Sequence, residues 1–419
     1  MVTRMPLDAP TPTKTSGDEF FRTEGAYTGL GAPIPGGRID LWILSEGPHI
    51  ESHVELFDEL CWRLLGEDLP LWRATLYAGT LHPLIRGIGA RWLRDLRVVE
   101  DFRILHGSGA TDEYLLSPIR ATIERGTPFR RRLDAEIPEY PLLEKLRKAG
   151  ATDYFALALN RTFNGYPVVT WATDRPRGFS DADIAALEDI NPALAAIADT
   201  RVVRRISTNL LDTYFGPQAG RRILAGQIRQ GEGERLRAVV MVTDLRDFTG
   251  LSDRLSGDEV IMLLDDYFDA LATPIQERTG EVLKFMGDGL LAIFPAADDD
   301  DFSTSSVRAL EAATEGLERL DAVNKARRAA GRGELRTGVG LHLGEVIFGN
   351  VGAPGRLDFT VIGPAVNLAS RIEDLTKRLL RPVLFSSAFA RVCPRPLISL
   401  GFQQVRGLSD PEEVFALPE

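Results

Sequence analysis

The chain has 419 residues, 44% hydrophobic and 26% charged, which predicts two or three globular domains and excludes a wholly disordered or fibrous protein. Its net charge of −11 argues against a broad nucleic-acid-binding surface, because phosphate backbones require a positive footprint. Its two cysteines, Cys61 and Cys393, lack metal-ligand spacing and predict neither a disulfide framework nor a zinc site. No stretch has the ~18 apolar residues of a membrane helix or the core of a signal peptide, so we expect a cytoplasmic protein.

The first half of the chain predicts an arm followed by a mixed domain. Residues 1–38 are rich in Pro, Thr and Gly, which favours a flexible amino-terminal arm. Over residues 39–200 helical and strand-like patterns alternate, with an amphipathic helix from His53 and one or two strands from Asp68. The dipeptide Asn164-Gly165 predicts a hairpin.

A helical linker is expected to follow. Ser180 is a helix-cap candidate, and helical spacing continues past Pro192, which predicts one long connecting helix. Four apolar residues on that helix have spacings that would suit a short parallel two-helix seam: Ile197, Val203, Ile206 and Leu210. Helix-breaking residues at Gly216-Pro217 and at the glycines of 231–233 mark the end of the helical pattern. We therefore expect a helical linker over residues 201–235.

Residues 236–419 show an alternation of strands and helices with candidate metal ligands at strand ends. The apolar strand 238–242 leads to Asp244, and Asp247 either joins it or caps the next segment. A tight turn between two strands exposes Asp288 between two glycines. Two such carboxylates could hold Mg²⁺ or Mn²⁺ ions that bridge substrate phosphates, although an Asp beside Gly is also an ordinary turn residue.

Asn367 and Arg371 lie four residues apart and therefore on one face of a predicted helix. An amide and a guanidinium on one face could bind a ribose oxygen and a phosphate. A solvated polar stripe is the alternative interpretation.

Four segments occur in an order that resembles the signature blocks of the class III nucleotide cyclases: VTDLRDFT, VLKFMGDGLLAIF, GLHLGEVIFGNVG and DFTVIGPAVNLASRIE. The resemblance covers roughly residues 236 to 417. It implies an α+β, ferredoxin-like cyclase catalytic domain over 236–419.

The resemblance also implies roles for individual residues. Asp244 and Asp288 would hold two divalent metals per site, with the Leu245 carbonyl as an extra ligand. Asn367 and Arg371 match the family's transition-state pair. The purine-reading pair and a phosphate-binding residue match Lys284, Thr360 and Arg406.

Lys284 favours ATP as the substrate, because an ammonium group only donates hydrogen bonds and suits adenine N1 but not the N1–H of guanine. The implied function is an adenylate cyclase in which the ribose 3′-hydroxyl attacks the α-phosphate, giving cyclic AMP and pyrophosphate. The alternatives are a guanylate cyclase and a catalytically silent nucleotide-binding regulatory module.

The resemblance further implies a homodimer with active sites at its interface, because the family's metal ligands and its Asn/Arg pair face one another across two protomers. Residues 39–200 resemble the GAF-like or PAS-like regulatory domains that precede such cyclases. A sensor of a small ligand and a dimerisation scaffold both fit that domain.

Overall fold

The computed structural model describes residues 21–106, 117–134, 139–159, 167–296, 302–406 and 409–418. The chain divides into two compact units, residues 1–210 and 211–419, a boundary that falls inside the predicted linker. The predicted hairpin at Asn164-Gly165 lies outside the described residues. Among the helices that are described, none is long and apolar enough to cross a membrane.

The first unit is built on a seven-stranded antiparallel sheet in the order β1-β4-β3-β2-β7-β6-β5. Its strands are β1 (Phe21–Thr28), β2 (Arg73–Gly79), β3 (Ile85–Leu93), β4 (Val98–Leu105), β5 (Phe129–Arg132), β6 (Asp153–Ala158) and β7 (Val168–Thr173). Its helices are α1 (Ile39–Ser45), η1 (Gly47–His49), α2 (His53–Gly66), α4 (Pro118–Arg125), α5 (Pro141–Lys148), α6 (Asp181–Asp189) and α7 (Asn191–Phe215), the last of which continues past the boundary.

The core of the first unit lies between the sheet and α2, where the predicted amphipathic helix is confirmed. The Ser52 hydroxyl caps α2 by accepting from the Glu55 backbone N–H. Inside the core, the Asp58 carboxylate accepts indole N–H bonds from Trp62 at 2.9 Å and Trp92 at 3.1 Å. These tryptophans are therefore structural, since burying a carboxylate requires donors around it.

The structure corrects three predictions about this unit. Residues 21–28 of the predicted arm form β1, which pairs with β4 at the edge of the sheet. The predicted long helix is two helices, α6 and α7, separated at Ile190, because Pro192 has no N–H and restricts the residue before it. Ile197 and Ile206, predicted for a two-helix seam, are instead buried in the first unit.

The second unit contains an eight-stranded sheet in the order β14-β15-β13-β11-β8-β10-β9, with β12 paired to β11. Its strands are β8 (Gly233–Leu245), β9 (Glu281–Met286), β10 (Gly289–Pro295), β11 (Thr337–Ala353), β12 (Arg356–Ile362), β13 (Val383–Ser386), β14 (Ile398–Gln403) and β15 (Glu412–Ala416). Its helices are α8 (Pro217–Leu224), α9 (Phe248–Ser252), α10 (Gly257–Glu277), α11 (Phe302–Ala329), α12 (Pro364–Leu379) and α13 (Ser387–Ala390).

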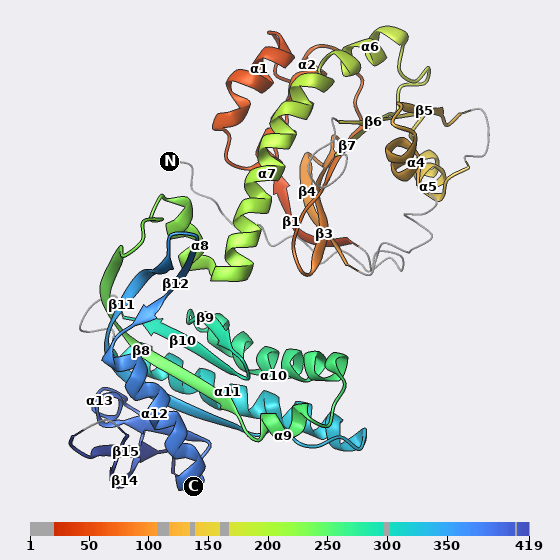
Figure 1. Cartoon of the computed structure of the whole chain (residues 1–419). Helices are drawn as coiled ribbons and strands as arrows, with labels where there is room; N and C mark the ends of the chain where they lie inside the picture. Colours follow the sequence, from red (N-terminus) through yellow and green to blue (C-terminus); the bar gives the residue numbers. More distant parts are fainter. Residues whose placement is uncertain are drawn as a thin grey trace. The chain divides into compact units, whose positions relative to one another are not determined.

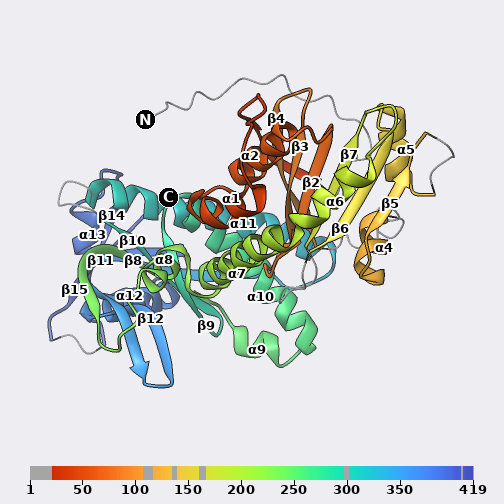
Figure 2. The same ribbon diagram turned by 90° about the horizontal axis from the view of Figure 1, so that it is seen from above.

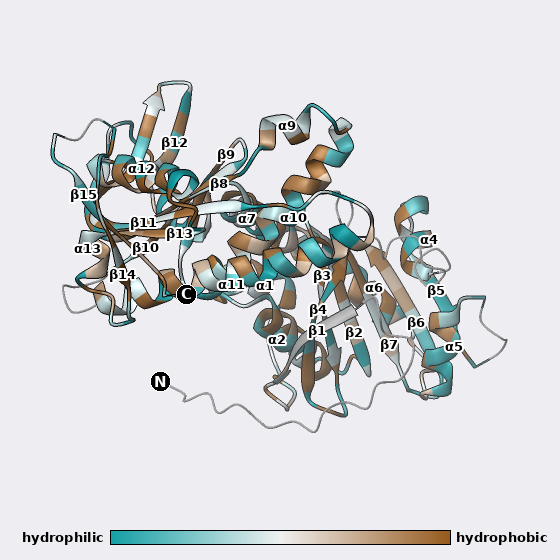
Figure 3. Ribbon diagram, turned by 90° about the horizontal axis from the view of Figure 1, so that it is seen from below, coloured by the Kyte–Doolittle hydropathy of each residue, from teal (hydrophilic) through white to brown (hydrophobic). Residues whose placement is uncertain are grey.

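The chain order β8-α10-β9-β10-α11-β11, with β8 between β10 and β11, is the split βαβ arrangement of ferredoxin-like folds. One face of the sheet packs against α10 and α11, and the other packs against α12 and α8 (Figure 1). Figure 2 shows the β11–β12 hairpin extending beyond the body of this unit. In Figure 3 hydrophobic residues line the strands, which agrees with cores on both faces.

Candidate active site

Two carboxylates meet at one end of the central strand of the second unit. Asp244 is the penultimate residue of β8, and it pairs across the ladder with Gly289, the residue that follows Asp288. The backbone N–H of Leu245 donates to the Asp288 carbonyl at 3.2 Å, which fixes the β9–β10 turn against the end of β8. Gly287 enables this turn with a φ of 67°. The structure thus brings together the predicted metal residues Asp244, Leu245 and Asp288.

The backbone at Asp244 is supported from within the core. Tyr267 on α10 is fully buried, and its hydroxyl lies 2.8 Å from Thr337 Oγ1. The Thr337 hydroxyl in turn donates to the Asp244 carbonyl at 3.1 Å. Since that hydroxyl uses its proton on Asp244, Tyr267 donates to Thr337. This chain of hydrogen bonds ties the carboxylate end of β8 to α10 and β11.

A lysine that the sequence did not single out pairs with the carboxylates. Lys377, in the last turn of α12, places Nζ 2.8 Å from Asp244 Oδ2, and this contact raises the pKa of the lysine. Burial, followed by the negative charge of Asp244, raises the pKa of Asp288. Two carboxylates in this position therefore repel one another, and a cation relieves that repulsion.

A second charged pair lies beneath the carboxylates. Arg246 Nη1 is 3.2 Å from Glu373 Oε1, and both side chains are largely buried. Burial raises the pKa of Glu373 to about 7, and the positive charge of Arg246 opposes this shift. Neither residue was predicted for the site. Glu373 and Lys377 lie four residues apart on α12, and this spacing was the only signal in the sequence.

These residues fit a divalent metal whose coordination is completed by oxygens of a substrate. Carboxylate and carbonyl oxygens are what Mg²⁺ and Mn²⁺ prefer, and Mg²⁺ is commonly held by one or two carboxylates plus phosphate oxygens. Within the described residues no cluster of three or more His, Cys, Asp or Glu side chains could hold a metal alone. Asp244, Asp288 and the Leu245 carbonyl would therefore need substrate oxygens to complete a metal's coordination.

Lys284 and Thr360 lie on a common surface formed by β9 and β12. Lys284 Nζ is 3.4 Å from Asp358 Oδ2, a partner that the sequence did not predict. Asp358 and Thr360 are two residues apart on β12 and therefore point to the same face. Thr360 is 3% exposed, and its hydroxyl has no hydrogen-bond partner among the described residues. An unused hydroxyl thus lies on the face that Lys284 approaches.

Asn367 and Arg371 lie together on α12, but away from the carboxylates. Neither side chain makes a hydrogen bond or ion pair with another residue that the structure describes. Lys377 reaches Asp244 from the carboxyl end of the same helix. At a rise of 1.5 Å per residue, Asn367 is roughly 15 Å and Arg371 roughly 9 Å back along the axis from Lys377. Along the helix axis these two residues therefore lie roughly two to three turns before the residue that contacts Asp244.

Arg406 lies on the exposed segment after β14, directly before residues 407–408, which are outside the described part. Arg406 makes no hydrogen bond or ion pair with the other candidate residues among the residues that the structure describes.

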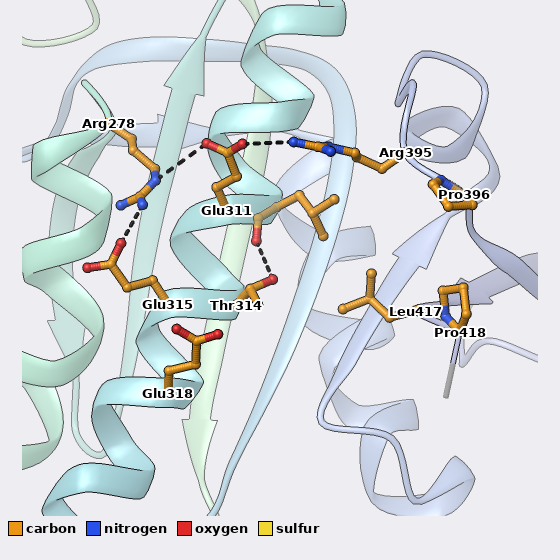
Figure 4. A pocket seen from close by; sticks show the side chains of 10 residues that line it. Arg278, Glu311, Thr314, Glu315, Glu318, Arg395, Pro396, Leu417 and Pro418 are labelled. Atoms are coloured by element: carbon orange, nitrogen blue, oxygen red, sulfur yellow. Dashed lines mark hydrogen bonds and ion pairs between the residues drawn. The ribbon is translucent and has the colours of Figure 1, made fainter.

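A hollow elsewhere on this unit, of about 430 Å³, lies between α11 and the chain end (Figure 4). Arg278 pairs with Glu315 and Arg395 with Glu311 in this hollow. No candidate site residue lines it, so it is not the candidate site.

Comparison with known proteins points to one family. Residues 234–380 match the family described as the adenylate and guanylate cyclase catalytic domain. The chain is 31% identical over 252 residues to adenylate cyclase 1 of Rhizobium meliloti and 33% identical over 230 residues to an adenylate cyclase of Anabaena cylindrica. These matches cover 58% and 51% of this chain but only 37% and 44% of the relatives, so the chain spans less than half of their length.

The solved structure of the guanylyl cyclase Cya2 is also similar, at 31% identity and a TM-score of 0.40, over 44% of this chain and 92% of that one.

Proposed function

We propose that this chain is an adenylate cyclase that converts ATP to 3′,5′-cyclic AMP and pyrophosphate. The observation that carries the proposal is the meeting of Asp244 and Asp288 at the end of β8, inside the segment that matches the cyclase catalytic domain. In the proposed reaction the ribose 3′-oxygen forms a bond to the α-phosphorus, and the bond from that phosphorus to the pyrophosphate oxygen breaks.

Each candidate residue then has a task in positioning or charge stabilisation. Two divalent ions, when held by Asp244, Asp288 and the Leu245 carbonyl, would lower the pKa of the 3′-hydroxyl and neutralise phosphate charge. Arg371 would offset negative charge on the transferring phosphoryl group, and Asn367 would orient the ribose. The exposed guanidinium of Arg406 would bind phosphate oxygens.

The purine would be read on the β9–β12 surface. The Lys284 ammonium can donate to adenine N1 but conflicts with the N1–H of guanine. The Thr360 hydroxyl, which is buried and has no partner of its own among the described residues, can accept from the adenine 6-amino group. A buried polar group of the purine that finds no matching hydrogen-bond partner costs about 1–3 kcal/mol of binding free energy. The β9–β12 surface should therefore prefer ATP to GTP.

The active site would be completed by a second copy of the chain. Asn367 and Arg371 are carried away from Asp244 along α12 in one protomer, which supports a homodimer with two sites related by a twofold axis. The amino-terminal domain would regulate the catalytic domain through the linker 201–235, as a GAF-like or PAS-like sensor. Deleting residues 1–200 distinguishes a sensor from a dimerisation scaffold. If the shortened chain still assembles but is no longer regulated, the domain is a sensor, and if it no longer assembles, the domain is a scaffold.

Product formation by the purified chain tests the proposed activity. The chain is incubated with ATP or GTP and Mg²⁺ or Mn²⁺, and the products are separated by chromatography. Cyclic AMP from ATP is expected, with loss of activity in Asp288→Ala and no loss in Asp253→Ala, an exposed aspartate after α9. Cyclic GMP as the main product would contradict the role of Lys284, and no product with either nucleotide would favour a silent nucleotide-binding module.

A further inference from the structure

The sheet of the first unit has one apolar face beneath α2 and a second face on which polar and charged residues lie beside a smaller apolar cluster that includes Tyr154 and Ala172. Successive side chains on a strand point to opposite faces. On β2, Ala74 belongs to the core beneath α2, and Arg73 and Thr75 therefore point to the opposite face. On β7 the same alternation puts Trp171 in the core and Thr170 on the opposite face.

The strand register aligns the polar residues of this face in one row. Thr75 is opposite Arg91 of β3 on one side and opposite Thr170 of β7 on the other. Arg91 is in turn opposite Glu100 of β4 and forms an ion pair with it at 2.9 Å. The row thus runs across four strands, and its two charged residues, Arg91 and Glu100, neutralise each other.

Arg73 is next to this row on β2, and its charge is not balanced. Its guanidinium makes no hydrogen bond and no ion pair with any residue that the structure describes. Burial, followed by the positive charge of Arg91, lowers the pKa of Arg73 to about 10, so it remains charged at neutral pH. Arg73 is half-buried, and a partly desolvated charge without a partner is costly, so proteins normally supply one.

The acid whose charge acts on Arg73 is Glu100, and that carboxylate is already paired with Arg91, whereas the hydroxyl groups nearby can donate hydrogen bonds. Ala172 is directly opposite Arg73 on β7, and Tyr154 is the next residue along that register on β6. The Tyr154 hydroxyl is buried and has no hydrogen-bond partner of normal geometry among the described residues. The guanidinium and this hydroxyl share one chemical preference, because both can donate to an oxyanion.

We propose that this face of the first unit binds a small oxyanion, a carboxylate or a phosphate group, through Arg73 with donors from Thr75, Thr170 and Tyr154. A planar guanidinium binds either group through two parallel N–H···O hydrogen bonds. The experiment below distinguishes a carboxylate from a phosphate. The site is separate from the candidate active site, and it does not depend on the proposed enzyme activity.

The full-length chain offers a local probe for this site. All five tryptophans lie between Trp42 and Trp171, inside the first unit, so tryptophan fluorescence reports the unfolding of that unit alone. Urea unfolding is followed in chloride, inorganic phosphate and acetate at constant ionic strength. The midpoint for the unaltered chain is expected to rise saturably with phosphate, acetate or both, since a ligand that binds only the folded state stabilises it.

Arg73→Met is the decisive variant. Without an oxyanion its midpoint is expected to lie above that of the unaltered chain, because an unpaired, half-buried charge has been removed. The oxyanion response is expected to vanish. Arg177→Met, which alters an exposed arginine of the same unit, is the matched control and should respond as the unaltered chain does.

Thr170→Val provides a second variant that keeps the side-chain shape and should weaken the oxyanion response. The proposal is overturned if neither oxyanion shifts the midpoint of the unaltered chain. It is also overturned if Arg73→Met shows the same oxyanion response as the unaltered chain.

Discussion

Lys377 places an ammonium group against Asp244, so a divalent ion at this site has to compete with a positive charge that the chain itself supplies. The contact is partly solvated, with the lysine side chain 49% and the aspartate side chain 32% exposed. Partly exposed ion pairs contribute at most about 1 kcal/mol. In the proposed metal site the lysine would therefore weaken metal binding moderately, and a metal–phosphate complex would displace it.

Replacing this lysine tests the competition. Lys377→Met should bind Mn²⁺ roughly twofold to fivefold more tightly, because it leaves the two carboxylates without their internal counter-ion. Isothermal titration calorimetry in the absence of nucleotide measures the effect. Arg378→Met is the control, since Arg378 donates to Gln403 and not to Asp244. Weaker binding by Lys377→Met would mean that the lysine supports the metal rather than competing with it.

The pH dependence of metal binding follows from the raised pKa of Asp288. A protonated carboxyl does not ligate a metal, so Mn²⁺ affinity should fall as the pH is lowered through this pKa, above the value of about 3.9 for an exposed aspartate. Lys377 lowers the pKa of Asp288, so the loss should begin at a higher pH in Lys377→Met. Calorimetric titrations between about pH 4 and 7 measure both curves. Identical curves would contradict the coupling of Lys377 to Asp288.

Among the secondary-structure elements, those that the sequence predicted well carry a local signal. The helix from His53 has a serine cap and an apolar stripe, and the β9–β10 turn has glycines on both sides of Asp288. Elements that depend on distant partners were missed or wrong. Strand β1 exists because it pairs with β4, and Lys377 meets Asp244 across 133 residues of sequence. No local pattern encodes such contacts, which explains why Lys377 and Asp358 were not predicted.

The β8–β10 ladder depends on a glycine beside the carboxylates. A Cβ atom at Gly289 would overlap the carbonyl oxygen of Thr243 on β8. Gly289→Ala should therefore separate the two strands, cost about 1–3 kcal/mol in the free energy of unfolding, and weaken Mn²⁺ binding. Circular dichroism during urea unfolding and calorimetry measure the two effects.

Gly250→Ala is the matched control for this change, because a Cβ atom there meets open space. Equal stability of the two variants would show that β8 and β10 tolerate the larger separation.

At the scale of the whole molecule, the predicted site residues of the second unit lie on different surfaces of one chain. Asp244 and Asp288 lie at the end of β8, Lys284 and Thr360 lie on the β9–β12 surface, and Asn367 and Arg371 lie farther back on α12. Through its resemblance to two-protomer cyclases, the sequence predicted two sets of residues on opposite sides of the site, with the metal ligands on one side and Lys284, Thr360, Asn367 and Arg371 on the other. The helix geometry of α12 independently supports the separation of Asn367 and Arg371 from the metal ligands, because Lys377 uses the end of that helix to reach Asp244.

Mixed dimers test this account most directly. Chains with Asp244→Ala are co-expressed in equal amounts with chains carrying Arg371→Ala, and cyclic AMP formation is measured on the purified mixture. Random pairing yields one intact site in half of the dimers, so we expect about a quarter of the unaltered activity from two inactive parents. Asp244→Ala mixed with Asp288→Ala, which damages the same half of the site twice, should remain inactive. No recovery in the first mixture, or equal recovery in both, would contradict an active site shared between two copies.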